Sequence, residues 1–562
     1  MCCDIGAVRM IQKRFLYILI PLLILPYLLS LPVDLIDIDT AQYGEIAREM
    51  IRGNDFIHLR DHGRKYLDKP IMTFWTIAAS FKVFGISAWS FRLTAVLALL
   101  AGAYSVFRLT ELISENRNRA LVAGLSYLSI PGLFGIVLNP IIDIYLCMYI
   151  VFAHHAYYLG FKKNKNYYYL MYLWIGIGFI TKGPISAVIP AISIGGDILY
   201  RRDWKRLLEM KLLPGILIAA VPPLLWSLVL HEEFGSFGPY FFLWLQSFGR
   251  FYKKMYNQKL DPAYFYTSFL WGLATVSVFL GICAWREGWD FFSRNWAGLR
   301  LKTLQNFSKG KSDGDYVLYF WVFVYLFLIG FSRYQLPQYV YWVLPGGIIY
   351  ASKFIEEISS AEFSFRSEWF YFIPQILFLS AVIAVPVFVI DAGPVYYGII
   401  ILYLVGFFFL KKENAFFSAL FLPSALIFAL AGAEIYPALL KYQPSREIGK
   451  KLQELEPGKD GFYSFGLPFS KRSYEFYSDR IIKNIADTDK FAEVLKKEGS
   501  RLVITPQEYA MFLEGYLGER FKMEMVGVYP AHKVATPTKE YLLKSKRESS
   551  AKKVLLIRVS LK

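Results

Sequence analysis

The chain has 562 residues, of which 55% are hydrophobic and only 19% are charged, and its mean hydropathy is +0.36. Soluble domains carry roughly 25% charged residues, and cores of ordinary size could not bury this much apolar surface. The composition therefore excludes an array of soluble domains and excludes a disordered chain. A polytopic membrane protein remains.

The formal net charge of +17 could indicate a nucleic-acid partner. Such a partner needs basic residues clustered on one face, together with a recognition motif. Here Lys and Arg are spread along the chain in short groups between apolar stretches, and no such motif accompanies them. This pattern is typical of membrane topology, so we expect no nucleic-acid partner.

Apolar runs predict the membrane helices, because a span needs about 20 mostly apolar residues. The run from Phe15 to Val33 has no small-residue cleavage pattern after it, so it is expected to stay as the first helix. Thirteen spans are predicted, near residues 14–33, 88–110, 119–138, 141–160, 166–181, 185–200, 212–230, 264–285, 316–331, 339–356, 369–390, 394–410 and 415–436. The stretch 71–86 is amphipathic and is expected to lie at the membrane interface.

Short basic loops predict the orientation, because Lys and Arg favour the cytoplasmic side. Arg9, Lys13 and Arg14 precede the first span and place the N-terminus in the cytoplasm. With thirteen spans, the basic clusters between helices all fall on that side. These clusters are Arg117 and Arg119; Lys162, Lys163 and Lys165; Arg201, Arg202, Lys205 and Arg206; residues 286–311; and Lys411 and Lys412.

The opposite, external side receives five segments between the helices, 34–87, 138–143, 181–184, 231–263 and 331–338. It also receives the C-terminal part. We divide the chain into a transmembrane domain, 1–440, and a soluble α/β domain, 441–562. The second domain has strand-like runs at 501–505 and 554–558, and its 24 Lys and Arg against 16 Asp and Glu give it +8 of the total charge.

Three carboxylates, Asp34, Asp37 and Asp39, directly follow the first span. Ionisable residues at the membrane edge are costly and are therefore functional candidates. Helix capping and solvation would explain them equally well if they stood alone. Short motifs elsewhere on the external side change the balance.

These motifs occur in a fixed order along the chain. They are Asp39-x-x-x-Tyr43-x-Glu45-Ile46-Ala47-Arg48-Glu49-Met50, Tyr66-Leu67-Asp68-Lys69-Pro70, Asn139-x-x-x-Asp143, Thr181-Lys182-Gly183-Pro184, Gly249-Arg250-Phe251, Ser332-Arg333-x-x-Leu336-Pro337-x-Tyr339 and Ser473-x-x-Phe476-Tyr477. Together they resemble the GT-C membrane glycosyltransferases, in the branch of the protein O-mannosyltransferases and the lipid A aminoarabinose transferases. Each motif is weak alone, whereas seven in order across nearly the whole chain are specific.

The resemblance implies an enzyme that takes a sugar from a polyprenyl phosphate and transfers it by direct displacement with inversion. A donor already in the membrane agrees with the absence of a Gly-rich nucleotide-binding loop. Lipid A or a related glycolipid is the favoured acceptor, while a protein or a polysaccharide remains open. The donor sugar is undetermined. The implied location is a bacterial-type inner membrane.

The resemblance also implies roles for individual residues. Asp39 is the expected general base, or the carboxylate that orients the acceptor hydroxyl, and Asp143 is the second acidic group. Lys69, Arg250 and Tyr339 are expected to bind the donor phosphate, where negative charge grows as the sugar leaves. The expected supporting residues are Tyr43, Asp68, Lys182 and Arg333, and Lys182 could pair with Asp143.

Several of these residues have a simpler interpretation. Arg250 lies in an aromatic stretch and could anchor at lipid headgroups, and Tyr339 could belong to an aromatic belt. Lys182 could be a lysine that reaches from the membrane to water. Asp37 is expected to be a solvated neighbour rather than a catalytic group.

Metal binding is left open. His58 and His62 lie four residues apart beside Asp61 and could bind zinc on a helix, but the glycines around them favour a loop. Some relatives pair an acidic residue with a histidine at a metal. Asp68 is that acidic residue here, whereas Gln246 or Ser247 replaces the histidine. Thr40 also replaces the usual glutamate after Asp39.

Two other classes share the many helices. A transporter or flippase of lipid-linked sugars would be expected to show two related halves or broken helices at matching positions, and neither is visible. A structural assembly factor with an external interaction domain is the third class. The charged candidates gather at the external face rather than at mid-membrane, and this favours the enzyme.

Overall fold

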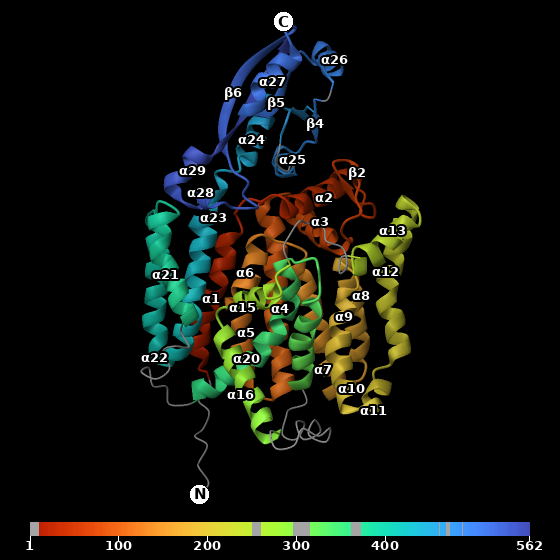
Figure 1. Ribbon diagram of the computed structural model, residues 1–562, viewed down its shortest axis with the longest axis vertical. Coiled ribbons are helices and arrows are strands. Elements are labelled where there is room, and N and C mark those ends of the chain that lie inside the picture. Colours follow the sequence, from red (N-terminus) through yellow and green to blue (C-terminus); the bar gives the residue numbers. More distant parts are fainter. Residues whose placement is uncertain are drawn as a thin grey trace.

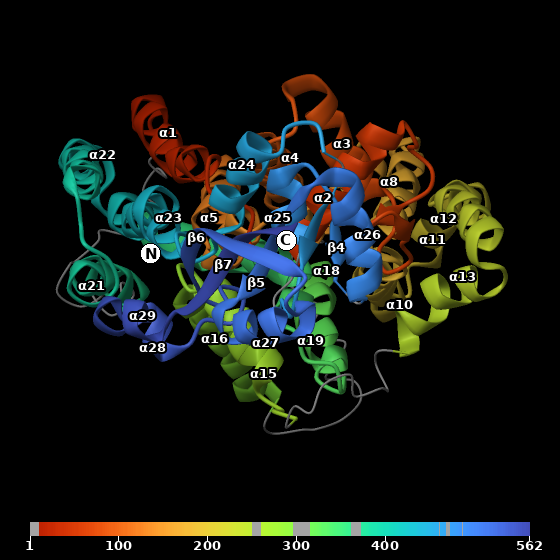
Figure 2. The same cartoon turned by 90° about the horizontal axis from the view of Figure 1, so that it is seen from above.

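The computed structural model describes residues 11–249, 260–295, 315–360, 373–459, 461–467, 472–485 and 487–562. Figure 1 shows a bundle of helices with a small sheet domain above it. Seen from above in Figure 2, the sheet lies over the middle of the bundle, with α21 and α22 at one edge and α12 and α13 at the opposite edge.

The helices of the bundle lie in the apolar runs of the sequence. They are α1 (Lys13–Ser30), α4 (Ala88–Ser114), α5 (Arg117–Ser129), α6 (Pro131–Leu138), α7 (Asp143–Lys162), α8 (Tyr167–Lys182), α9 (Ile185–Pro190), α10 (Gly196–Arg201), α11 (Trp204–Glu209), α12 (Leu212–Phe234), α13 (Phe237–Tyr240), α15 (Tyr264–Gly272), α16 (Ser277–Asn295), α18 (Asp315–Tyr319), α19 (Tyr325–Ile329), α20 (Leu344–Ser360), α21 (Ile373–Phe388), α22 (Pro394–Leu430) and α23 (Tyr436–Leu440). Wider π-helical turns η1 (Ala191–Gly195), η2 (Phe241–Leu245), η3 (Phe320–Val324) and η6 (Ala431–Ile435), and the 3₁₀ turn η4 (Pro337–Val343), lie between them.

Five helices in the described part are long and apolar enough to cross a membrane, or up to seven if each bent pair counts as one span. The pairs bend by 46° between α5 and α6 and by 117° between Tyr264–Gly272 and Ser277–Trp289. The chain is therefore a multi-pass membrane protein, while the count of thirteen spans stays a prediction. The run predicted near 264–285 is not one straight helix.

A layer of short elements lies between the bundle and the sheet (Figure 1). It consists of α2 (Asp39–Gly53), α3 (Met72–Phe84) and the hairpin of β1 (Arg60–Asp61) and β2 (Arg64–Lys65). The helix α3 corresponds to the stretch predicted to be interfacial. An apolar core of its own joins α2 to α3, in which the Tyr43 and Phe74 rings lie 5.8 Å apart edge to face.

The C-terminal part contains a mixed five-stranded sheet of order β4-β3-β5-β7-β6. The pairs β3–β4 and β3–β5 are parallel, and β5–β7 and β6–β7 are antiparallel. Its elements are α24 (Ser445–Leu455), β3 (Phe462–Ser464), α25 (Arg472–Ser478), β4 (Ile482–Asn484), α26 (Thr488–Glu498), β5 (Ser500–Pro506), α27 (Gln507–Leu517), β6 (Phe521–Ala531), α28 (Lys539–Leu542), α29 (Lys544–Ser550) and β7 (Lys552–Leu561).

Both faces of this sheet are covered, because alternate strand residues point in opposite directions. In β5, Leu502 and Ile504 join the core that includes α24, whereas Val503 joins the core that includes α26 and α27. The strands predicted at 501–505 and 554–558 are confirmed. The fold class predicted from the sequence, a helical membrane protein with a small C-terminal α/β domain, is thus confirmed.

Candidate active site

A buried ion pair lies where α7 begins and α8 ends. Asp143 is the first residue of α7 and is 2% exposed, and Lys182 is the last residue of α8. The Nζ atom of Lys182 lies 2.5 Å from Asp143 Oδ1, and the Trp342 indole N–H donates to the same oxygen at 2.8 Å. A carboxylate suits the positive end of one helix dipole and an ammonium suits the negative end of the other. The pair that the sequence suggested between these residues is present.

Aromatic rings surround the Lys182 ammonium. It lies 4.9 Å from the centre of the Trp342 ring and 5.5 Å from that of Tyr339, distances at which a cation is attracted to the ring face. The Tyr325 hydroxyl donates to the Tyr339 carbonyl at 3.0 Å and holds this turn in place. Gly183, at φ 90°, ends α8 in a conformation that favours glycine.

The ion pair borders a cavity of about 550 Å³. Most of its wall is apolar and comes from η2, α9, α19 and the turn after α19. The polar side chains that interrupt this wall are those of Asp68, Lys69, Lys182, Gln246, Ser247, Ser332 and Tyr339. Ligand sites are commonly built in this way, from an apolar cleft with a few polar groups that fix orientation. An amphipathic anion complements this cavity.

Lys69 supplies the second described cation of the cavity wall. Its Nζ atom lies 2.6 Å from Asp68 Oδ2, and the Gln246 side-chain amide donates to the other oxygen of Asp68. The Lys69 and Asp68 side chains are 17% and 44% exposed. This pair is therefore open to whatever enters the cavity.

Asp39 opens α2 and is exposed. The charge of Asp39 affects Tyr43, a buried residue of the same helix. Burial, and then the charge of Asp39, raise the pKa of Tyr43 well above its ordinary value, and Asp68 and Asp143 add to this increase. Three of the carboxylates predicted from the sequence thus act electrostatically on one tyrosine. The hydroxyl of neighbouring Tyr66 is buried and has no hydrogen-bond partner in the described part of the chain.

One predicted supporting residue, Arg333, is not brought into this cluster. Arg333 is exposed and does not line the cavity, although its neighbour Ser332 does. Arg250 lies outside the described residues. Trp342 is a site residue that the sequence analysis missed. Its signal was available, because residues three apart along a helical turn share a face and Trp342 follows Tyr339 by three.

The first two carboxylates of the loop hold the C-terminal domain. Asp37, expected to be solvated, instead accepts hydrogen bonds from the Ser473 hydroxyl at 2.5 Å and the Ser473 backbone N–H at 3.2 Å. Asp34 accepts from the Tyr477 hydroxyl at 3.1 Å, and Arg446 donates to the same oxygen at 3.0 Å. The motif that contains Ser473 and Tyr477 therefore contacts the loop that leads to Asp39.

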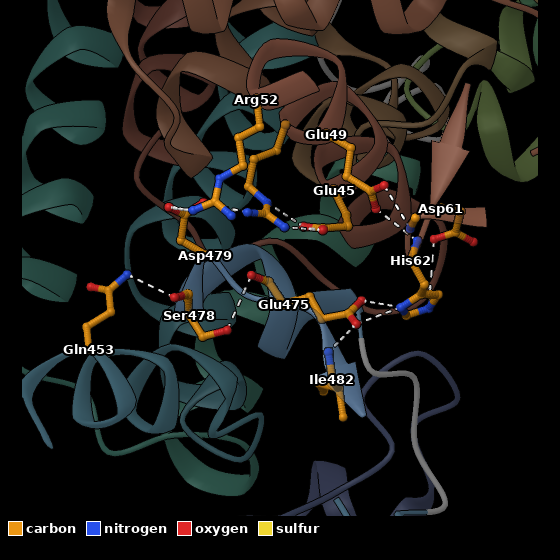
Figure 3. Close-up of polar contacts among 12 residues, drawn as sticks. Glu45, Glu49, Arg52, Asp61, His62, Gln453, Glu475, Ser478, Asp479 and Ile482 are labelled. Atoms are coloured by element: carbon orange, nitrogen blue, oxygen red, sulfur yellow. Dashed lines mark hydrogen bonds and ion pairs between the residues drawn. The ribbon is translucent and has the colours of Figure 1, made fainter. Parts of the chain in front are cut away.

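A second ionic group joins α2 to α25 (Figure 3). Arg48 donates through Nε to Glu45 at 2.8 Å and through Nη1 to Asp479 at 2.5 Å. Glu45 and Arg48 are 0% and 1% exposed. Arg52 pairs with the second oxygen of Asp479. These residues form one part of a group that we call the docking cluster. Its members are Glu45, Arg48, Arg52 and Asp479, together with His62, Glu475, Asp61 and Arg472.

His62 completes the docking cluster on the other side of α25 (Figure 3). Its Nδ1 lies 2.6 Å from the Glu475 carboxylate, and Glu475 also accepts from the Ile482 N–H at 2.8 Å. Arg472 donates to Asp61 at 2.9 Å. His58 has a different partner, Asp55, at 3.0 Å. The two histidines that could have bound zinc therefore pair with separate carboxylates.

The residues at Asp68 do not fit a metal ion. One Asp68 oxygen accepts from an amide N–H of Gln246 and the other pairs with Lys69, and neither an ammonium nor an amide nitrogen is a metal ligand. Nowhere in the described ranges do three His, Cys, Asp or Glu side chains form a group that could hold a metal.

Comparison with known proteins supports this architecture. A family model described as dolichyl-phosphate-mannose-protein mannosyltransferase matches residues 68–226. An uncharacterized protein of Aquifex aeolicus is 26% identical over 505 residues, which cover 87% of this chain and 92% of that protein. A solved structure, ArnT from Cupriavidus metallidurans bound to undecaprenyl phosphate, has the same fold, with a TM-score of 0.71, 16% identity, and 96% and 97% of the two chains covered.

The fold and the order of the motifs define a GT-C membrane protein of the glycosyltransferase class. Among named relatives, the undecaprenyl phosphate-alpha-4-amino-4-deoxy-L-arabinose arabinosyl transferase of Edwardsiella ictaluri is 28% identical over 330 residues, covering 57% of this chain and 55% of that protein. The corresponding protein of Yersinia enterocolitica is 30% identical over 267 residues, covering 44% and 46%. The chain is similar to the protein O-mannosyltransferases and the aminoarabinose transferases. It matches about half the length of these two named relatives.

Proposed function

We propose that the chain transfers a glycosyl group from a polyprenyl-phosphate sugar to an acceptor at the external membrane face, by direct displacement with inversion. A glycolipid of the lipid A type is the proposed acceptor. The cavity carries this proposal, because an apolar wall and two lysines suit a lipid with a phosphate headgroup. The names of the aminoarabinose transferases, which act on an undecaprenyl phosphate sugar, agree with it.

The proposed roles follow from where the side chains lie. Lys69 and Lys182 bind the phosphate of the donor and stabilise the charge that develops as polyprenyl phosphate leaves. The Tyr339 hydroxyl donates a hydrogen bond to the same phosphate. Arg250 has this role from the sequence motif alone. Arg333, exposed beside Ser332, is proposed to support the site from its rim.

The two acids are proposed to act differently. Asp143 is buried and accepts from both Lys182 and Trp342, so it serves to place that ammonium and the sugar above it. Asp39 is exposed at the start of α2, where an acceptor hydroxyl can reach it, and it takes the proton of that hydroxyl. Tyr43 and Asp68 are proposed to support Asp39 and Asp143.

The proposed orientation places the N-terminus in the cytoplasm and the site, with the C-terminal domain, outside a bacterial-type inner membrane. It rests on the basic loops between the helices. The docking cluster agrees with it, because it requires the loop of Asp39 and the C-terminal domain to share one side.

A transfer assay tests the proposal. The full chain in lipid nanodiscs is incubated with a radiolabelled polyprenyl-phosphate sugar and lipid A, and labelled acceptor is measured. Lys69→Ala, Asp143→Asn and Asp39→Asn should each lower transfer by roughly 10²–10³-fold. Lys65→Ala is the matched control, because Lys65 lies in the same loop but its ammonium points to the Glu233 carbonyl at 2.8 Å.

The results separate the function classes. The same labelled donor is also given to the chain in sealed vesicles. Movement of label across the vesicle membrane, with no label on any acceptor in either assay, would refute the enzyme and favour a transporter. Label on a protein or polysaccharide extract, but not on lipid A, would overturn the proposed acceptor and keep the enzyme. Full activity of Lys69→Ala would remove that residue from the phosphate site.

A further inference from the structure

Arg92 is a buried cation near the start of α4 that the roles above do not use. Its side chain is 0% exposed. In the described ranges no carboxylate lies within ion-pair distance of its guanidinium. A buried charge is costly unless hydrogen bonds satisfy it, so its contacts need an explanation.

The Arg92 side chain donates its hydrogen bonds to backbone carbonyl groups. Its Nε donates to Leu138 at 2.9 Å, its Nη1 to Leu31 at 2.8 Å and to Val33 at 2.5 Å, and its Nη2 to Asp34 at 3.3 Å. Leu138 ends α6 and Leu31 caps the end of α1, where carbonyls lack helical partners and the helix dipole favours a cation. One planar guanidinium therefore joins the ends of two helices.

The joined segments lead to the two proposed acids. Asp34 precedes Asp39 by five residues, and Leu138 precedes Asp143 by five residues. Each acid is the first residue of the helix that follows, α2 or α7. Holding the two carbonyl segments together thus limits how far one acid can move relative to the other.

A second tie links the same segments closer to the acids. The hydroxyl of Thr40 donates to the Pro140 carbonyl at 3.2 Å and also lies against the Asn139 side-chain oxygen. Thr40 is fully buried. Thr40 replaces the glutamate that usually follows the aspartate in this sequence motif. In this chain the position therefore holds the two segments together.

We propose that Arg92 is a positioning residue that fixes Asp39 and Asp143 relative to one another, assisted by Thr40. This role rests on the proposed function of the two acids. A lysine could not replace it, because one ammonium on a flexible stem cannot reach carbonyls on both sides as a planar fork with five N–H groups does.

The test compares Arg92→Lys with a matched buried arginine. Arg547 is 5% exposed and also donates to carbonyls, those of Tyr541, Leu542 and Val389 at 2.6–2.8 Å, but it lies in the C-terminal domain away from both acids. Each variant of the full chain is studied in nanodiscs, by hydrogen exchange with mass spectrometry and by transfer kinetics.

For Arg92→Lys, we expect faster exchange in both 31–38 and 138–142, kcat lowered by about 10–100-fold, and a KM for the donor that stays within about twofold. Arg547→Lys should change exchange only around its own carbonyl partners and leave kcat unchanged. Thr40→Val should show the Arg92 pattern at smaller size, and it serves as the second variant if Arg92→Lys does not accumulate in the membrane.

Unchanged exchange in either segment of Arg92→Lys overturns the inference. So does faster exchange with an unchanged kcat. A wild-type chain that transfers no sugar, while Arg92→Lys still loosens both segments together, refutes the proposed function and keeps the structural coupling.

Discussion

Two groups of ion pairs near α2 use different cations. In the docking cluster, the carboxylates Glu45, Asp479 and Asp61 are bound by arginines. At the cavity, the described cations are the lysines Lys69 and Lys182. An arginine binds a carboxylate through a rigid planar fork, whereas a lysine is a point charge on a flexible stem. Arginine pairs fix the two domains together, and lysine pairs can turn toward an anion that enters.

Burial distinguishes the Glu45–Arg48 pair of the docking cluster from the Asp68–Lys69 pair at the cavity. Glu45 and Arg48 are almost fully enclosed, at 0% and 1% exposure, whereas the Asp68 and Lys69 side chains are 44% and 17% exposed. Breaking an enclosed pair leaves a charge with no water to replace its partner. Breaking an open pair costs little stability but removes a group from the site. The Glu45–Arg48 pair should therefore govern stability, and the Asp68–Lys69 pair should govern activity.

The largest effect on stability is expected from Arg48→Met. This change leaves Glu45 buried without its bidentate partner, which should cost about 3–5 kcal/mol. The apparent unfolding temperature in detergent and the rate of proteolytic cleavage around residue 440 measure it. The double variant Arg48→Met, Glu45→Met should recover much of the loss, and a loss under about 1 kcal/mol in the single variant would contradict the division.

The next effect is expected at Lys182, where we predict a loss of transfer. Lys182→Met should lower transfer by roughly 10²–10³-fold, and Lys182→Arg should rescue little, because a planar fork cannot occupy the same place between two rings and Asp143. Steady-state transfer by nanodisc-embedded protein measures both. Full rescue by Lys182→Arg would show that only the charge matters here.

A pH dependence of intermediate size should arise from His62. Burial lowers the pKa of His62, but the hydrogen bond and charge of Glu475 outweigh this effect and hold it above its ordinary value. The protonated imidazole therefore stabilises docking fully below about pH 6.5, and this contribution is lost as the pH rises through the higher pKa of the folded state.

Limited proteolysis of the C-terminal domain between pH 6 and pH 9 measures this dependence. Wild-type protein should become more sensitive as the pH rises, while His62→Gln should be sensitive throughout and show a flatter profile. The charged groups that face His62 are Glu475, Asp61 and Arg472. An identical profile in the two proteins would assign the pH dependence to other groups.

The smallest effect is expected from Asp479→Asn. Asp479 is 45% exposed and Arg52 is 46% exposed, so solvent screens most of their attraction. We expect a loss of about 1 kcal/mol or less, reduced further at high salt. A loss as large as that of Arg48→Met, read from the same unfolding midpoints, would show that the exposed half of the docking cluster carries the energy.

Much of the fold was predictable because apolar runs and strand alternation are local signals. The runs locate the helices of the bundle, and alternation locates β5 and β7. The sharp bend near Gly272 and the π-helical turns were not predictable, because a break between two apolar segments depends on what packs around it. The number of spans depends on such breaks.

The site divides in the same way. Asp68, Lys69, Asp143, Lys182 and Tyr339 were predictable from short motifs in external turns, and they meet at or beside one cavity. The partners of Asp37 and His62 were not, because they lie more than 400 residues away in the C-terminal domain. Arg92 was missed because it lies inside an apolar helix, and no local pattern shows which carbonyls a buried guanidinium binds.

The helix α2 connects the docking cluster to the candidate active site and acts as a rigid lever between them. It carries Asp39 at its first residue and the docked Arg48 about two and a half turns away. At 1.5 Å per residue, Asp39 lies about 13 Å along the helix from Arg48, so a tilt of about 10° around Arg48 would displace Asp39 by about 2 Å. A displacement of even about 1 Å can slow a reaction by roughly 100-fold. A ligand that tilts α2 by shifting the C-terminal domain would therefore lower the rate of transfer without contacting the cavity.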